Sequence, residues 1–183
     1  MKFGNQLDYF GIVILITCSL ISILLFAFYD YPWIRNCFMA TSLIFGSICT
    51  VLTLHPEFSS VDYRGFRATM FIMFGLSGVL PVLASFALFD YDTVVQRSGL
   101  YWLILEGVFY ITGAVLYACR FPERLVHIDQ HLLELLQNPL PGKFDIFGHS
   151  HQIFHIFVVI AAFCHWKALV QCYHYLHQHT LVV

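Results

Sequence analysis

Charged side chains are scarce in this sequence: Asp, Glu, Lys and Arg make up 11% of its 183 residues, against about 25% in a typical soluble domain. Hydrophobic residues make up 59%, which leaves too little polar surface for a soluble protein with buried core helices. No alternating ten-residue pattern indicates the strands of a membrane β-barrel. The six cysteines show no CxxC spacing, so we expect reduced packing residues. We expect no nucleic-acid partner.

Long apolar runs fill the chain instead. A transmembrane helix needs roughly 20 apolar residues, and five runs approach or exceed that length. They cover residues 10–29, 36–54, 68–89, 98–119 and 146–170. The sequence therefore predicts an all-α, multi-pass transmembrane helical bundle that forms one domain over residues 1–183.

The basic residues give this bundle an orientation. Five spans place the termini on opposite sides, and the loops richer in Lys and Arg are expected in the cytoplasm. One side carries Lys2, Arg64, Arg67, Arg120, Arg124 and Lys143; the other carries Arg35, Arg97 and Lys167. We expect an integral membrane protein with a cytoplasmic N-terminus and an extracellular or lumenal C-terminus. Residues 1–8 are too short for a cleavable signal peptide ahead of a full span.

Three local features lie between or within the spans. Pro81 is expected to kink the third span and to free a carbonyl for a neighbouring group. Residues 89–92 begin an outer loop. Residues 125–136 carry apolar residues at helical spacing, which predicts a short amphipathic helix on the cytoplasmic membrane surface.

The strongest chemical signal is a pair of histidines, His151 and His155, at the start of the last span. Their i, i+4 spacing puts both imidazoles on one helix face, close enough to bind one metal ion. Polar side chains inside a span are usually functional. A catalytic zinc usually has three protein ligands, and Asp8 lies at the same predicted depth, as a further ligand or as the holder of a metal-bound water. Position alone favours another interpretation of Asp8, as an N-terminal helix cap.

Other polar residues fit this site less well. His149 precedes the helix that Ser150 is expected to cap, which makes it a weaker ligand candidate. His165 lies ten residues beyond His155, about 15 Å along the axis, and belongs to the outer half of the span. Glu106 either pairs with a polar neighbour inside the bundle or reaches water at its edge. A disordered, solvated tail is expected to carry Cys172, His174, His177 and His179.

Several segments together resemble one family, the progestin and adipoQ receptors, also called adiponectin receptors or haemolysin III-related proteins. Residues 7–12 (LDYFGI) resemble the LDYxGI entry to the third membrane helix of that family. Further similar segments are residues 75–81 (GLSGVLP), 110–118 (YITGAVLYA), 122–124 (PER), 141–146 (PGKFDI) and 150–155 (SHQIFH).

The resemblance implies a seven-helix fold with a cytoplasmic N-terminus and a zinc site held by three histidines. Two of these correspond to His151 and His155, and an aspartate thought to act through the zinc-bound water corresponds to Asp8. The third histidine lies on the family's second helix, ahead of LDYxGI. We therefore expect this chain to hold five of seven helices and to lack that ligand. About fourteen residues near 125–140 are an insertion relative to the family, either a real surface helix or an unspliced intron.

The resemblance also implies a function: a zinc-dependent, receptor-like membrane protein with a signalling role in lipid metabolism and a ceramidase-like amide hydrolysis in which Asp8 is catalytic. Expected partners are membrane lipids such as ceramide or free fatty acid, an extracellular protein ligand and a further copy of the chain in an oligomer. Two alternatives stay open. One is a non-catalytic receptor or scaffold with a structural or lost zinc site, and the other is a metal-homeostasis protein.

Overall fold

The computed structural model describes residues 2–58, 61–122 and 150–180, and every element in these ranges is helical. The α-helices are α1 (Lys2–Ala27), α2 (Pro32–Leu54), α3 (Arg64–Leu76), α4 (Val79–Leu88), α5 (Tyr91–Ser98), α6 (Leu100–Cys119) and α8 (Ser150–Thr180), with a 3-10 turn at Val61–Tyr63. The predicted surface helix at 125–136 and His149 lie outside the described residues.

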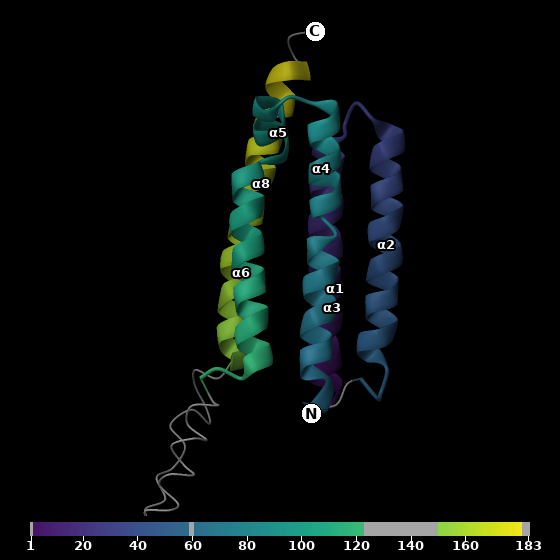
Figure 1. Ribbon diagram of the computed structural model, residues 1–183, viewed down its shortest axis with the longest axis vertical. Coiled ribbons are helices and arrows are strands. Elements are labelled where there is room, and N and C mark those ends of the chain that lie inside the picture. Colours follow the sequence, from purple (N-terminus) through teal and green to yellow (C-terminus); the bar gives the residue numbers. More distant parts are fainter. Residues whose placement is uncertain (1, 59–60, 123–149, 181–183) are drawn as a thin grey trace, which may run out of the picture.

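Within these ranges, five helical segments are long and apolar enough to cross a membrane. They are Gln6–Ala27, Pro32–Leu54, Arg64–Leu88, Leu100–Cys119 and Ser150–His179. They correspond in order to the five predicted spans, which confirms the all-α transmembrane bundle. Figure 1 shows them standing side by side, with α6 against α8 and α1 between that pair and α2. Helix α1 begins at one end of the bundle and α8 ends at the other, as five crossings require.

Pro81 marks a real interruption in the third span. The helix breaks into α3 and α4 at Ser77 and Gly78, four and three residues before the proline. Because Pro81 has no N–H to donate to the carbonyl of Ser77, the backbone N–H of Leu80 donates to that oxygen instead, at 3.2 Å. The α-helix is thus interrupted just ahead of Pro81, and, as predicted, a neighbouring group satisfies the freed carbonyl.

The outer loop predicted from residue 89 contains a helix, α5. Asp90 caps it: its carboxylate accepts from the Thr93 hydroxyl at 2.8 Å and from the Thr93 backbone N–H at 3.4 Å. These bonds favour the ionised form and hold the pKa of Asp90 below its ordinary value. Gly99, with φ of 61°, ends α5 in the left-handed conformation that glycine tolerates. A side chain there would meet Ala168 of α8 at 2.8 Å.

Small residues also let α6 and α8 approach closely. A Cβ added to Gly113 on α6 would lie 2.8 Å from the Cβ of Phe157 on α8, a distance that packed side chains do not adopt. By contrast, a Cβ on Gly107 of the same helix would meet nothing within 4 Å. The two helices therefore depend on the absence of a side chain at residue 113, as membrane helix pairs often do.

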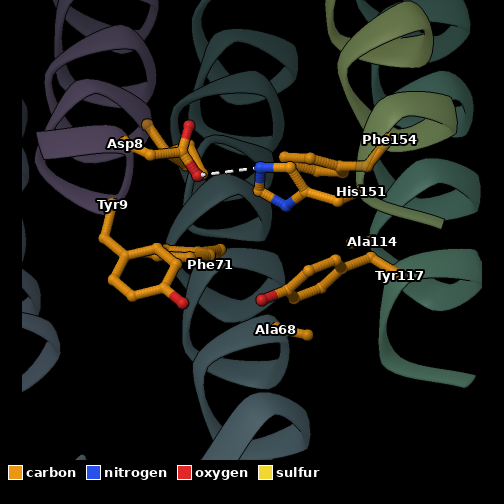
Figure 2. Close-up of a pocket in the computed structure, with 9 residues that line it drawn as sticks. Asp8, Tyr9, Ala68, Phe71, Ala114, Tyr117, His151 and Phe154 are labelled. Atoms are coloured by element: carbon orange, nitrogen blue, oxygen red, sulfur yellow. Dashed lines mark ion pairs between the residues drawn. The ribbon is translucent and has the colours of Figure 1, made fainter. Parts of the chain in front are cut away.

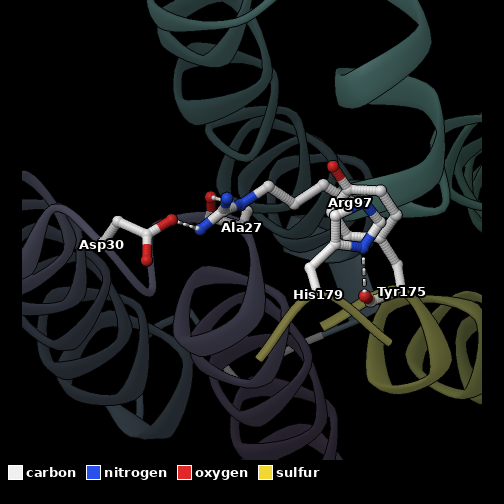
Figure 3. Close-up of polar contacts among 5 residues, drawn as sticks. All are labelled: Ala27, Asp30, Arg97, Tyr175 and His179. Atoms are coloured by element: carbon white, nitrogen blue, oxygen red, sulfur yellow. Dashed lines mark hydrogen bonds and ion pairs between the residues drawn. The ribbon is translucent and has the colours of Figure 1, made fainter. Parts of the chain in front are cut away.

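Arg97 ties the end of α1 to α5 (Figure 3). Its Nε donates to the carbonyl of Ala27 at 2.8 Å, and its Nη2 lies 2.6 Å from Oδ2 of Asp30. The guanidinium also lies over the Phe89 ring, 4.7 Å from its centroid. This contact set fixes the turn between α1 and α2 against the α4–α5 connection.

The C-terminal cluster predicted as a disordered tail belongs to α8. Cys172 is buried at 1% exposure, and Nδ1 of His179 lies 2.8 Å from the carbonyl oxygen of Tyr175 one turn earlier (Figure 3). The tail interpretation is wrong because α8 continues past its apolar part and packs against α5. Gln171, for example, donates to the carbonyl of Val95 at 3.1 Å. All six cysteines are free, as predicted.

Candidate metal centre

The two histidines lie on the first turns of α8 and face the same way. Their Nε2 atoms are 3.1 Å apart, and their rings meet edge to face at 4.6 Å between centroids. Ser150, the first residue of α8, is buried at 1% exposure, which fixes the start of the helix against the bundle. The i, i+4 prediction for His151 and His155 is confirmed.

Asp8 meets this pair from α1. Its Oδ2 lies 3.5 Å from Nε2 of His151, and its Oδ1 lies 3.4 Å from Nε2 of His155. The prediction that Asp8 shares a depth with the pair is therefore confirmed. The interpretation of Asp8 as an N-terminal cap is wrong, because α1 already begins at Lys2. The helix starts well before its apolar core, so Asp8 lies inside it and points across to α8.

The three distances between the donor atoms of Asp8, His151 and His155 can be compared with those between the ligands of a bound zinc ion. Two ligand atoms bound to one zinc at 2.0–2.1 Å in tetrahedral geometry lie about 3.3 Å apart. The observed 3.1, 3.4 and 3.5 Å all lie near that value. Among the described residues, this trio is the group of His, Cys, Asp and Glu side chains whose donor atoms converge within 4.8 Å. Two imidazoles and a carboxylate are ligands that zinc accepts, so the residues present fit the ion.

One carboxylate oxygen of Asp8 makes no hydrogen bond within the described part of the chain. Its Oδ2 is buried and has no hydrogen-bond partner among the residues that the structure describes. The side chains of His151 and His155 are 40% and 43% exposed, whereas that of Asp8 is 22% exposed. Burying a carboxylate oxygen without a partner is costly, and a cation or a water held by the histidines would remove that cost.

A small cavity adjoins the trio (Figure 2). Its volume is about 10 Å³, the space that one water molecule needs. Its walls come from α1, α3, α6 and α8 and consist of Asp8, Tyr9, Ile12, Ala68, Phe71, Ala114, Tyr117, His151 and Phe154. The centre therefore lies where four helices meet, beside a space of the size of one water.

Two tyrosines, Tyr9 and Tyr117, line the cavity, and an arginine lies over the ring of each; none of the four was predicted as a site residue. The guanidinium of Arg67 lies 4.6 Å from the Tyr9 ring centroid, and that of Arg64 lies 4.9 Å from the Tyr117 ring centroid. Arg67 is only 2% exposed and donates to the carbonyl of Phe58 at 2.6 Å. The signal was present in the sequence, since Tyr9 follows Asp8 directly and both arginines lie at the start of α3.

His165 does not join this centre, as its position in the sequence predicted. It pairs with Glu106 of α6, with Nδ1 of His165 3.0 Å from Oε2 of Glu106. Of the two outcomes left open for Glu106, the structure has the partner inside the bundle.

Comparison with known proteins gives a consistent set of relatives. The family model described as "Haemolysin-III related" matches residues 1–166. The ADIPOR-like receptor IZH2 of Saccharomyces cerevisiae is 39% identical over 174 residues, which are 95% of this chain and 50% of that protein. The adiponectin receptor protein of Drosophila melanogaster is 39% identical over 165 residues, 90% of this chain and 34% of that protein. The progestin and adipoQ receptor-like protein 1 of Caenorhabditis elegans is 35% identical over 169 residues, 92% and 36%. The chain thus spans between a third and a half of the length of these relatives.

Proposed function

The chain belongs to the haemolysin III-related family, and from this premise we propose that it is an adiponectin receptor-like membrane protein that binds zinc and hydrolyses a lipid amide of the ceramide type. The observation that carries the proposal is the convergence of Asp8 with two imidazoles at separations of 3.4 and 3.5 Å. The family match supports the receptor-like class and a signalling role in lipid metabolism.

His151 and His155 would hold the zinc, with Asp8 beside it. A bound zinc lowers the pKa of its water and polarises an amide carbonyl. The chain's own contribution is to hold a carboxylate oxygen, Oδ2 of Asp8, next to that water, where it can orient the water and accept its proton. The apolar walls of the adjoining cavity, such as Phe71 and Phe154, keep further water away from the reacting bond.

The remaining parts of the proposal follow the charge distribution and the family. The loops rich in Lys and Arg support a cytoplasmic N-terminus and a metal centre near the cytoplasmic leaflet. The acyl chain of the substrate would lie between helices, with membrane lipids as its source and free fatty acid as a product. An extracellular protein ligand and an oligomeric state are part of the same receptor proposal.

Metal analysis of the purified chain tests the zinc site first. We expect about one zinc per chain, because structural and catalytic zinc sites bind tightly, and less than about 0.2 in His151→Ala and His155→Ala. His174→Ala, an exposed histidine on the same helix, is the matched control and keeps its zinc. A wild-type chain with less than about 0.2 zinc would refute the proposed centre.

Hydrolysis of a fluorescent ceramide then tests the catalytic role of Asp8. We expect Asp8→Ala to lower the rate by about 100-fold or more, the usual contribution of a proton-accepting group, while zinc stays bound. If zinc is lost together with activity, Asp8 is instead a third ligand. If zinc-loaded wild-type protein hydrolyses no ceramide, the catalytic proposal fails.

A second candidate is a non-catalytic receptor with a structural zinc. The observation that favours it is that the trio bridges two helices distant in sequence, α1 and α8, so that one ion would fix both. In that case a chelator lowers the thermal stability of the wild-type chain, and no ceramide hydrolysis is present at any zinc content.

A further inference from the structure

A second polar network, separate from the metal centre, lies deep in the bundle and connects three helices. Ser22 on α1 has its Oγ 3.0 Å from Nε2 of His165 on α8. The other ring nitrogen of His165, Nδ1, lies 3.0 Å from Oε2 of Glu106 on α6. A hydroxyl, an imidazole and a carboxylate are thus connected in that order. The imidazole contacts the hydroxyl through Nε2 and the carboxylate through Nδ1, as in the triad of a serine hydrolase.

The surroundings make this network costly. All three residues lie within membrane-spanning segments, and the side chains of His165 and Glu106 are only 11% and 10% exposed. Ionisable side chains in such positions mark functional sites more often than not. His165 also lies ten residues, about 15 Å along the helix, from His155 of the metal centre, so the two groups of residues are separate.

The contact with Glu106 favours one tautomer of His165. An ionised carboxylate is an acceptor only, so it favours the tautomer with the proton on Nδ1. Nε2 then carries a lone pair directed at the hydroxyl of Ser22. That hydroxyl also donates to the carbonyl of Ser19 at 2.9 Å, so its proton can move between this contact and the imidazole.

Ser22 is the least buried residue of the network. Ser22 is half-buried, whereas His165 and Glu106 are buried. Ile14, Cys18 and Leu25 are exposed and lie at helical spacing along α1, and Ser22 lies in line with them. A molecule that reaches Ser22 along this stripe does so within the depth of the membrane, which selects for an uncharged, lipophilic substrate.

We propose that Ser22, His165 and Glu106 form a second, metal-independent hydrolytic site that takes a lipid ester with a long acyl chain. Ser22 is the nucleophile and His165 the base, and Glu106 is a positioning residue that acts through His165. This site does not depend on the zinc proposal for Asp8.

The reaction balances with water as the only co-reactant. The Oγ of Ser22 forms a bond to the acyl carbon while its proton passes to Nε2 of His165. The ester C–O bond breaks, and the alkoxide takes that proton and leaves as the alcohol. Water, deprotonated by His165, then attacks the acyl-serine, which releases the carboxylic acid and returns the proton to Ser22.

A long-chain alkyl fluorophosphonate tests the nucleophile directly in the full chain, in detergent or lipid nanodiscs. The probe forms an Oγ–P bond with loss of fluoride, and mass spectrometry identifies the modified peptide. Ser47 is the matched internal control, because it is exposed on α2 and donates only to the carbonyl of Leu43, at 2.8 Å, among the described residues. We expect Ser22 to react at least about 100-fold faster than Ser47, the scale of general-base assistance.

Two variants and a chelator assign the roles. His165→Gln keeps a hydrogen-bonding side chain but lacks a base, and we expect it to lower the labelling of Ser22 by about 100-fold. Glu106→Gln, of the same shape but unable to favour the correct tautomer, lowers it by at least about tenfold, and Glu106→Asp restores part of it. EDTA leaves the labelling unchanged. The proposal is overturned if Ser22 reacts no faster than Ser47, if His165→Gln reacts as fast as the wild type, or if EDTA abolishes labelling. The first comparison needs no variant, so it stands even where a substituted chain fails to fold.

Discussion

Removing one partner of the buried Glu106–His165 pair should destabilise the chain, whereas removing both should not. In His165→Leu, the carboxyl group of Glu106 stays at 8% exposure and loses the partner that was 3.0 Å away. Leaving a buried acceptor without its hydrogen-bond partner in this way costs about 1 to 3 kcal/mol. We expect the upper end of that range, about 3 kcal/mol, because the carboxyl group of Glu106 stays buried.

The double variant Glu106→Leu/His165→Leu replaces both polar groups with apolar ones of similar size. Such replacements are often neutral or stabilising, so we expect its stability to lie within about 1 kcal/mol of the wild type. The two substitutions are then coupled by at least about 2 kcal/mol.

Thermal unfolding of the purified chains in one detergent, followed by intrinsic fluorescence, measures this cycle. For a chain of this length, about 3 kcal/mol corresponds to a fall in Tm of roughly 6 to 12 °C. The reasoning is refuted if His165→Leu melts within about 2 °C of the wild type, or if the double variant is destabilised by the sum of the two single changes.

Three further predictions test the packing of α6 against α8, the contacts of Arg97 and the cap of α5. Gly113→Ala should lower the stability by about 1 to 3 kcal/mol through overpacking against α8. Gly107→Ala, where an added Cβ meets nothing within 4 Å, should be neutral or stabilising by up to about 1 kcal/mol. The Tm of each variant measures both effects. Arg97→Met should cost about 2 kcal/mol through its lost bonds, and Asp30→Asn less than about 1 kcal/mol, because the Asp30 side chain is 56% exposed; equal losses would contradict this. The lowered pKa of Asp90 means that its cap contributes fully above the unfolded-state pKa and is lost as pH falls through the lowered folded-state value. The protection of the α5 amides, measured as their exchange rate relative to the intrinsic rate at the same pH, should therefore fall over that acidic range, and Asp90→Ala should remove this fall.

Hydropathy was enough to predict the five spans and their order, because a bilayer imposes both length and composition on a helix. The spacing of His151 and His155 was enough to predict that their rings meet, since i and i+4 positions always face one another on a helix. These predictions depend on one helix at a time, and the structure confirms them.

Contacts that depend on how two helices are rotated were harder to predict. The sequence suggested the depth of His165 and left a buried partner open for Glu106, but no spacing rule linked either of them to Ser22. Position alone favours a cap for Asp8, because the apolar run begins at Phe10, yet the helix starts at Lys2. Hydropathy reports where a helix is apolar and does not report where it ends in the polar interface.

Helix α8 has a length that the membrane must accommodate. Its 31 residues span about 46 Å, whereas the hydrocarbon core of a bilayer is about 30 Å thick. The surplus of about three turns lies at the C-terminal end of α8, where Gln171 donates to the backbone of α5. We therefore expect α5 and the end of α8 to lie at the level of the lipid headgroups. A thicker bilayer would bring these polar turns towards the acyl chains, and the tilt of the helix would change in response. Because His155 and His165 both lie on α8, a change in membrane thickness would move the metal centre and the Ser22–His165–Glu106 network together.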